Sequence, residues 1–222
     1  MSGQPAASPE AVDFQAAAAI LAERDPVLRR LIAETGPIDL PPSNESHLAS
    51  LVRAIVYQQL AGAAAAAIHG RLLAALGGEV TAEGLLALSP EEMRAVGLSA
   101  NKTASLRDLA SKVLDGTVVL DPAQLWDESS DEVVARLSTV RGIGKWTAEM
   151  FLIFQLRRLD VWPTGDLGIR KGYGLAWGIP TPTAKQLDPM GDPYRPYRTV
   201  LAWYCWRAAE LYAGAADSAL TR

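Results

Sequence analysis

The sequence predicts an all-α protein, and three observations support this. Apolar residues recur with helical spacing along most of the 222 residues. Serine, threonine or aspartate precedes several of these stretches, as expected for helix N-caps, and proline often takes the first helical position. The one run that resembles a strand is the short segment 117–120. We therefore expect helices joined by short loops.

The predicted helices follow one another in a regular order. Residues 1–8 are expected to lack regular structure, and Ser8 is expected to cap a helix that extends to Glu23. Glycine and proline mark the breaks at 35–37, 41–44 and 97–99. Further helices are predicted over residues 24–33, 48–57, 63–76, 81–88, 90–96, 101–114, 131–137 and 146–156, with others beginning at Pro122 and Asp166.

The helix over 48–57 shows the clearest amphipathic pattern. Its apolar residues are spaced i, i+3, i+4, i+7, which places them on one face toward a core. They are Leu48, Leu51, Val52, Ile55 and Val56.

The order of these elements predicts two helical lobes. Residues 47–128 are expected to form the middle lobe. Residues 129–222 are expected to form a C-terminal lobe, against which the N-terminal helices of 1–46 pack. The prolines at 41 and 42 mark the first of these boundaries.

The net charge of −4 and the isoelectric point near 5.3 argue against a wide nucleic-acid-binding surface. The charge is uneven, however. Residues 1–46 carry seven acidic and three basic side chains, whereas residues 136–171 carry seven basic and three acidic ones. A DNA-binding region would therefore be a small patch near residues 136–171 that also uses backbone amides.

Cysteine and histidine are scarce, which limits the metal sites that the chain can form. Cys205 is the only cysteine, so a disulfide framework and a cysteine-ligated zinc site within one chain are excluded. His47 and His69 are the only histidines, which makes a histidine-rich metal centre improbable. The sequence shows no signal peptide and no apolar run of spanning length, which predicts a cytoplasmic protein with no membrane partner.

The segment Gly142-Ile143-Gly144 lies between two predicted helices. Two glycines around one apolar residue allow a sharp turn with positive φ, with no side chain to block an approaching group. The backbone N–H groups at the start of the next helix then suit a phosphate. The simpler interpretation is that these glycines only end a helix.

Five segments give the chain a family resemblance: RAIVYQQLA, GLSANKTASLRDLA, VRGIGKWTAEMF, DVWPTGDLGIRKG and DPYRPYRTVLAWYCW. In this order, across about residues 47–207, they resemble the helix-hairpin-helix superfamily of DNA base-excision glycosylases, and within it the 3-methyladenine DNA glycosylase II branch. The single cysteine excludes the iron–sulfur branch, which uses four cysteines. The 46 residues before the glutamine helix are too few for the additional N-terminal β-rich domain of some members.

The resemblance implies that Asp166 is the catalytic carboxylate, which stabilises positive charge on the sugar and directs water. An aspartate at this place is most often a helix N-cap, and the two roles are compatible. Members that also cut the strand carry a lysine where this chain has Trp146. Lys145 is the next residue and should point elsewhere, since one residue turns a helix by about 100°. We therefore expect a monofunctional glycosylase that hydrolyses alkylated bases by base flipping.

The resemblance also implies the DNA contacts. Gln59 would be wedged into the gap that the flipped base leaves, although two glutamines at a helix end are usually solvated surface. The hairpin contacts to the DNA backbone would come from Gly142, Gly144, Lys145 and Thr147. For Lys102, a solvated charge and a DNA contact remain equal alternatives.

The base pocket is expected to be aromatic, because an indole face attracts a cationic alkylated purine and no acid is needed to release it. This interpretation fits a site with no histidine nearby, although tryptophans are also common core residues. The expected pocket residues are Tyr57, Gln58, Trp146, Met150, Trp162 and Trp206. The pocket and Asp166 would meet in the cleft between the lobes.

The expected partner is damaged double-stranded DNA, bound by a monomer, and no cofactor is required. Backbone carbonyls of Ser138, Val140 and Ile143 could hold Na⁺ or K⁺ at the hairpin by the same resemblance. Two alternatives stay open: a non-catalytic helix-hairpin-helix DNA-binding protein, and a glycosylase for deaminated or oxidised bases. Asp166 argues against the first of them, and the aromatic pocket argues against the second.

Overall fold

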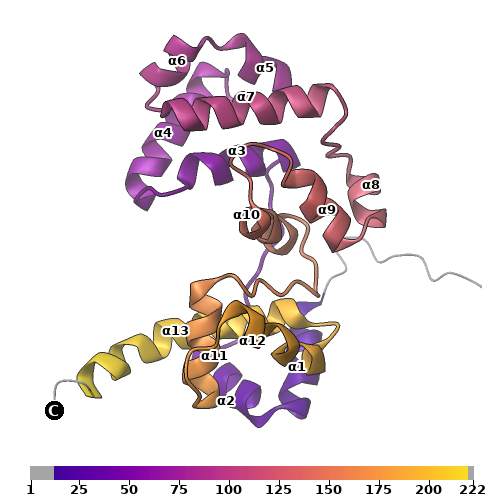
Figure 1. Ribbon diagram of the computed structural model, residues 1–222, viewed down its shortest axis with the longest axis vertical. Coiled ribbons are helices and arrows are strands. Elements are labelled where there is room, and N and C mark those ends of the chain that lie inside the picture. Colours follow the sequence, from indigo (N-terminus) through magenta and orange to yellow (C-terminus); the bar gives the residue numbers. More distant parts are fainter. Residues whose placement is uncertain (1–12, 220–222) are drawn as a thin grey trace, which may run out of the picture. The chain divides into compact units, whose positions relative to one another are not determined.

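The computed structural model describes residues 13–219 and is built from helices (Figure 1). Within this range there is no strand, which confirms the all-α prediction, and segment 117–120 is irregular. No helix in the described range is long and apolar enough to cross a membrane. The helices are α1 (Phe14–Arg24), α2 (Pro26–Thr35), α3 (His47–Tyr57), α4 (Gly62–Ala75), α5 (Ala82–Ala87), α6 (Pro90–Ala95), α7 (Ala100–Leu114), α8 (Pro122–Asp127), α9 (Ser130–Leu137), α10 (Lys145–Met150), the π-helix η2 (Phe151–Gln155), α11 (Leu167–Trp177), α12 (Ala184–Met190), the 3₁₀-helix η3 (Asp192–Tyr194) and α13 (Arg198–Ala219).

Local capping signals explain where most helices begin. Ser89 and Ser129 each form a capping box with a glutamate three residues on. The first helix differs from the prediction, because Asp13 caps it by accepting a hydrogen bond of 2.9 Å from the Ala16 N–H. The predicted cap Ser8 lies outside the described residues. Asp25 caps α2 in the same way, so this helix begins at Pro26.

The helix predicted over 146–156 is two elements. It is α-helical to Met150 and then widens into the π-helix η2. The apolar spacing of the two forms is similar over such a short stretch, so the sequence pattern did not distinguish them.

The chain divides into two compact units. We call Ser43–Phe151 the continuous unit, and the segments that end at Pro42 and begin at Leu152 the discontinuous unit. The helix-hairpin-helix therefore belongs with the middle helices, and not with the C-terminal segment as the predicted boundary at residue 129 had it. The physical reason is that α7 anchors the hairpin through Asp108 and Lys112.

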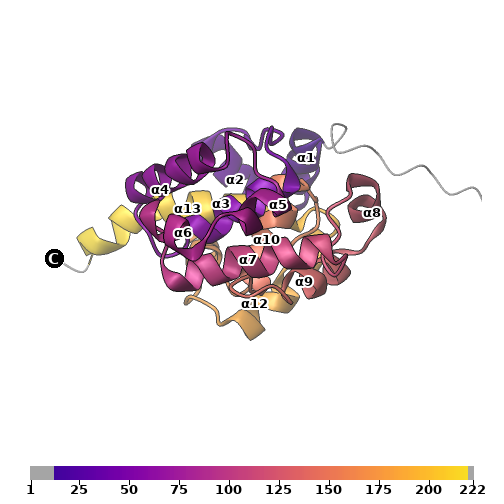
Figure 2. The same cartoon turned by 90° about the horizontal axis from the view of Figure 1, so that it is seen from above.

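In the continuous unit, α7 packs against α3, α5 and α6, while α9 packs against α10 (Figures 1 and 2). The predicted apolar stripe of α3 faces this core: Leu51, Val52, Ile55 and Val56 are fully buried. This places the C-terminal end of α3 next to the hairpin, where the Gln58 side chain contacts Gly142.

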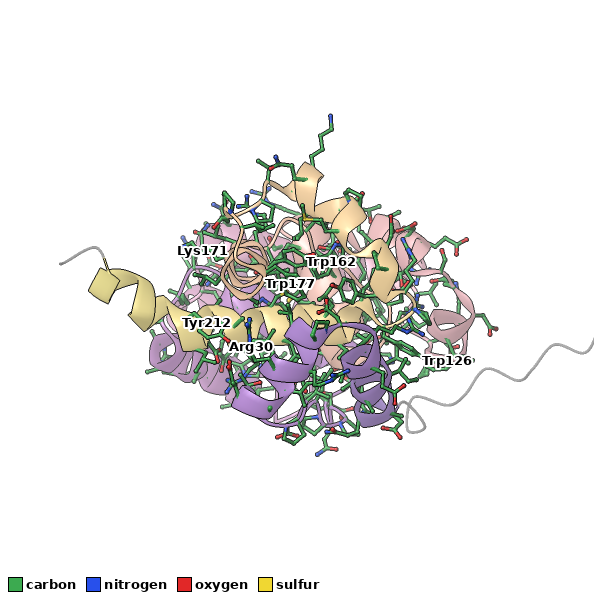
Figure 3. All side chains as sticks on the ribbon, turned by 90° about the horizontal axis from the view of Figure 1, so that it is seen from below. Arg30, Trp126, Trp162, Lys171, Trp177 and Tyr212 are labelled. Atoms are coloured by element: carbon green, nitrogen blue, oxygen red, sulfur yellow. The ribbon has the colours of Figure 1, made fainter. Side chains whose placement is uncertain are left out.

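In the discontinuous unit, α11 packs along α13, and α2 packs on both. The expected packing of the N-terminal helices with the C-terminal segment is thus observed within this unit. Tyr173 and Trp177 of α11 stack at 4.2 Å between ring centroids, and Asp25 accepts hydrogen bonds from Trp177 and Tyr194. Figure 3 shows Trp177 and Trp162 in this aromatic region. These contacts hold the C-terminal half of α11, the helix that Asp166 caps at its other end.

Candidate active site

The hairpin contains one left-handed glycine. Gly142 has φ +79°, and a Cβ added to it would lie 2.6 Å from the Ser105 hydroxyl. Gly144 has φ −96° and ψ 176°, which is extended backbone that other residues also adopt. The predicted turn with positive φ is therefore present, and Gly142 alone of the two glycines supplies it. Gly144 acts as the N-cap of α10, and a Cβ added to it would meet nothing within 4 Å beyond its chain neighbours.

Side chains of α7 hold the turn by hydrogen bonds. Asp108 Oδ2 accepts hydrogen bonds from the Arg141 N–H (2.7 Å) and from the Lys112 ammonium (2.8 Å). Lys112 also donates to the carbonyl of Thr139 at 2.6 Å. Burial alone would raise the pKa of Asp108, but the bonds from Arg141 and Lys112 lower it on balance. The hairpin backbone is thus fixed in place before any ligand binds.

The first turn of α10 presents backbone N–H groups, as every helix start does, and no side chain caps it. The Lys145 side chain is 71% exposed and pairs with Glu149 at 3.6 Å. It does not line the neighbouring cavity, whereas Trp146 does. This agrees with the expectation that residues 145 and 146 point in different directions.

A cavity of about 520 Å³ opens beside the hairpin within the continuous unit, and its size suits a small ligand. It combines four predicted pocket residues with the predicted wedge Gln59 and with hairpin residues. The Thr147 side chain, expected at the DNA backbone, is largely buried and lines the cavity instead. The lining residues are Ala54, Tyr57, Gln58, Gln59, Gly142, Trp146, Thr147 and Met150.

Ala54 is a lining residue that sequence reasoning missed. The signal was present, because Ala54 lies three residues before Tyr57 on α3 and so shares its face. Its methyl group leaves room in the cavity that a larger side chain would fill.

The loop from Gln58 to Ala61 carries two exposed side chains at its tip. Gln59 is exposed and has φ +57°, an uncommon backbone conformation for a residue other than glycine. Leu60 follows and is 39% exposed. Sequence reasoning did not single out Leu60, although a leucine in a polar helix end is the kind of apolar side chain that proteins insert between DNA bases.

Tyr57 has charged and aromatic neighbours. The Arg53 guanidinium lies 6.0 Å from the centre of the Tyr57 ring, and the His69 ring meets that ring edge-on at 6.0 Å. The expectation of a site with no histidine nearby was therefore wrong. Burial lowers the pKa of His69 and so favours the neutral form of this imidazole.

The Lys102 side chain is not simply a solvated charge, and its contact to DNA stays a prediction. Its ammonium group donates to the carbonyl of Val56 at 2.7 Å and so caps the last turn of α3. Burial lowers the pKa of Lys102. The residue therefore stabilises the end of the helix from which the glutamine loop starts.

Asp166 lies in the discontinuous unit, as the N-cap of α11. Its Oδ1 atom accepts hydrogen bonds from the Ile169 N–H (2.9 Å) and from the Trp206 indole N–H (3.1 Å). Trp206 comes from α13 and is partly exposed. The carboxylate is thus held by two different helices.

The two remaining predicted pocket tryptophans both belong to the discontinuous unit, outside the cavity described above. Trp162 is 6% exposed, donates its indole N–H to the carbonyl of Leu187 at 3.2 Å and meets Tyr173 edge-on (Figure 3). An indole this deeply buried is a core residue. Trp206 instead contacts Asp166.

Residues 52–189 match the family model described as HhH-GPD superfamily base excision DNA repair protein. The chain belongs to this superfamily. The HhH-GPD match contains the glutamine loop, the hairpin and Asp166, and it ends before Trp206.

Individual HhH-GPD proteins are similar over most of the chain. DNA-3-methyladenine glycosylase 1 of Schizosaccharomyces pombe is 39% identical over 166 residues, which is 72% of each protein. The crystal structure of a Bacillus halodurans DNA-3-methyladenine glycosidase has a TM-score of 0.80 and 35% identity, covering 87% of this chain and 89% of that one. The S. pombe 3-methyladenine DNA glycosylase Mag1 in complex with abasic DNA has a TM-score of 0.75 and 34% identity, covering 86% and 95%.

Proposed function

We propose that this protein is a monofunctional DNA glycosylase that removes N-alkylated purines, of the 3-methyladenine type, from damaged double-stranded DNA. The observation that carries the proposal is Asp166, a carboxylate fixed by two N–H donors at a helix start. Relatives named 3-methyladenine glycosylases at 34–39% identity support the substrate class. The reaction is the first step of base excision repair.

DNA binding is assigned to the hairpin of the continuous unit. The backbone N–H groups at the start of α10 receive a phosphate, and the exposed ammonium of Lys145 adds a positive charge. Gln59, with Leu60 beside it, fills the gap left by the flipped nucleotide. Flipping exposes the base edge and faces that the enzyme must read.

The base is assigned to the cavity that Tyr57 and Trp146 line. A purine alkylated on a ring nitrogen is cationic, and an indole face attracts a cation when water is excluded. Such a base leaves readily without protonation. The lowered pKa of His69 is consistent with this, because burial disfavours the protonated imidazole that would act as a general acid.

Asp166 is assigned the chemical step. As the bond between C1′ of the sugar and the base nitrogen breaks, positive charge develops on the sugar, and a fixed carboxylate stabilises it. The base leaves with the bonding electron pair as a neutral purine, water adds to C1′, and the proton that this water loses passes to the Asp166 carboxylate or to solvent. Trp146 occupies the place of the lyase lysine and cannot form a Schiff base, so the product is an intact strand with an abasic site.

We also propose that a monovalent cation, Na⁺ or K⁺, binds the hairpin through carbonyls of Ser138, Val140 and Ile143. Neutral carbonyl oxygens suit such ions, and although the Val140 carbonyl accepts a hydrogen bond from Ile143 N–H, a carbonyl has a second lone pair. When bound, the ion would attract a DNA phosphate. No other cofactor is proposed, and a monomer supplies every residue named.

The decisive experiment measures base release from methylated duplex DNA by the wild type and by Asp166→Asn, in single-turnover conditions, with the strand then tested for breaks without alkali. We expect release of 3-methyladenine, intact strands, and loss of release in the variant with DNA binding retained. Binding without release by the wild type would leave a DNA-binding protein. Release from deaminated or oxidised duplexes alone would assign the other substrate class.

A further inference from the structure

The structure assigns Trp206 as a positioning residue that acts through Asp166, with Gly168 as the residue that makes room for it. This inference rests on the proposed role of Asp166 and adds a partner to it. The indole N–H donates to Asp166 Oδ1 at 3.1 Å, on the same oxygen that accepts the Ile169 N–H. Trp206 therefore orients the carboxylate.

Hydrogen bonds from two helices restrict the rotation of the Asp166 carboxylate more than the N-cap hydrogen bond alone does. The Ile169 N–H belongs to the same helix as Asp166, and a single bond of this kind still allows the carboxylate plane to turn. The Trp206 N–H comes from α13 and approaches the same oxygen from another element. Together the two hydrogen bonds fix the direction in which the second carboxylate oxygen, Oδ2, points. A carboxylate that stabilises a developing positive charge needs such a fixed orientation.

Glycines on α11 bring the two partners together. A Cβ on Gly168 would lie 3.1 Å from both Asp166 Oδ1 and Trp206 Cδ1, which is tighter than ordinary packing. One turn further on, a Cβ on Gly172 would lie 1.7 Å from the carbonyl oxygen of Cys205. This spacing of four residues makes one smooth face on α11, against which the backbone of α13 lies directly. The close approach places the indole at the carboxylate.

The other side of the indole is also held. Phe154 of η2 stacks on Trp206 with ring centroids 5.9 Å apart and an interplanar angle of 21°. Phe154 itself is 40% exposed, so this stacking is not part of a deep core. A π-helix is a rare element that is frequent at functional sites, and here it supplies the residue that fixes the rotation of the indole.

Trp206→Phe tests the role, because it keeps an aromatic face and removes the N–H donor. We expect the single-turnover rate of methylated-purine release to fall about tenfold to hundredfold, the effect of one hydrogen bond to a charged group. Affinity for abasic duplex DNA should stay within about threefold. Gly168→Ala, which displaces the ring, should lower the rate in the same way. Trp203→Phe, the same change on the same helix without a contact to Asp166, should leave the rate unchanged.

Weaker DNA binding at an unchanged rate in Trp206→Phe would overturn the inference and make the indole a wall of the base site. A rate within twofold of wild type would also overturn it. If the wild type releases no methylated purine, the proposed function fails, and a second measurement still tests the contact between Trp206 and Asp166. The indole N–H signal of Trp206 is identified in the NMR spectrum as the one that Trp206→Phe removes. In Asp166→Ala this signal should lose its protection from hydrogen exchange. Unchanged protection would refute the contact.

Discussion

The side-chain amide of Gln58 donates a hydrogen bond of 2.8 Å to the carbonyl of Gly142, and so joins the loop after α3 to the hairpin. Both ends of this bond adjoin unusual backbone, because Gln59 has φ +57° and Gly142 itself has φ +79°. The bond connects the loop assigned as the wedge to the turn assigned to the phosphate.

Gln58→Met, which removes the donor and keeps the length of the side chain, should loosen the loop from the hairpin. Because one neutral hydrogen bond contributes about 0.5–1.5 kcal/mol, we expect a threefold to tenfold loss in affinity for abasic duplex DNA. Fluorescence anisotropy would measure it. Gln59→Ala and Leu60→Ala, measured beside it, show which exposed side chain acts as the wedge. An unchanged affinity in Gln58→Met would show that the bond has no role in binding.

Gly142→Ala should destabilise the protein, since alanine is strained at φ +79° and its Cβ would meet Ser105. We expect a loss of about 1–3 kcal/mol in the free energy of unfolding, measured by urea denaturation. Gly144→Ala is the matched control, because its backbone is extended and no atom lies within 4 Å of the added Cβ. It should cost under about 1 kcal/mol, the difference between glycine and alanine at an N-cap. Equal losses would contradict the assigned turn.

Lys102→Met and Lys145→Met separate a structural lysine from a DNA-binding one. Lys102 donates to Val56, so its loss should lower the free energy of unfolding by about 1 kcal/mol and leave the salt dependence of DNA binding unchanged. Lys145 is 71% exposed, so its loss should not affect stability. It should instead reduce the slope of log affinity against log salt by about one. The opposite pattern would reverse the two roles.

Asp160 gives the chain an acid-sensitive contact. Burial alone would raise its pKa, but Arg198, which donates to Oδ1 at 2.6 Å and to Oδ2 at 2.9 Å, and Arg195 lower it on balance. Because the folded pKa lies below the ordinary value of 3.8, this stabilisation is present above about pH 5 and is lost as pH falls through the folded pKa.

Asp160→Asn should therefore lower the melting temperature at pH 7 and reduce its fall between pH 5 and pH 3. Thermal unfolding across this range, followed by circular dichroism, measures both. Asp192→Asn removes an exposed contact to the same Arg195 and should change little. A pH profile identical to that of the wild type in Asp160→Asn would exclude this carboxylate as the source of acid sensitivity.

The helices were predictable where the signal was local. The apolar stripe on α3 depends on residues within two or three turns of one helix, and the structure confirms it. The helices predicted over residues 90–96 and 131–137 are also present, and each begins at a capping box formed by residues within one turn. The start of α1 was wrong because Asp13 and Ser8 are equally good caps in sequence. The sequence predicted a turn with positive φ at the two glycines but could not say which of them adopts it, because two glycines in one turn look alike until the backbone is known.

The site was predictable in part. The residues around the cavity follow from two short segments, at 57–59 and 142–150, and the structure brings these segments together. Contacts between distant residues could not be read from spacing. Lys102 reaches a carbonyl 46 residues away, and Trp206 reaches a carboxylate 40 residues away. The burial of Trp162 likewise depends on a partner, Leu187, that no local pattern indicates.

The order of the units along the chain has a consequence for synthesis. The continuous unit is a single uninterrupted stretch, whereas the discontinuous unit joins α1 and α2 to helices that follow residue 151. On the ribosome, α1 and α2 emerge first but meet α11 and α13 only after the whole continuous unit has been made. At translation rates of about 5–20 residues per second, α1 and α2 wait roughly 7–40 seconds for these partners. During that time, the apolar faces of α1 and α2 that α11 and α13 cover in the folded protein remain exposed to solvent.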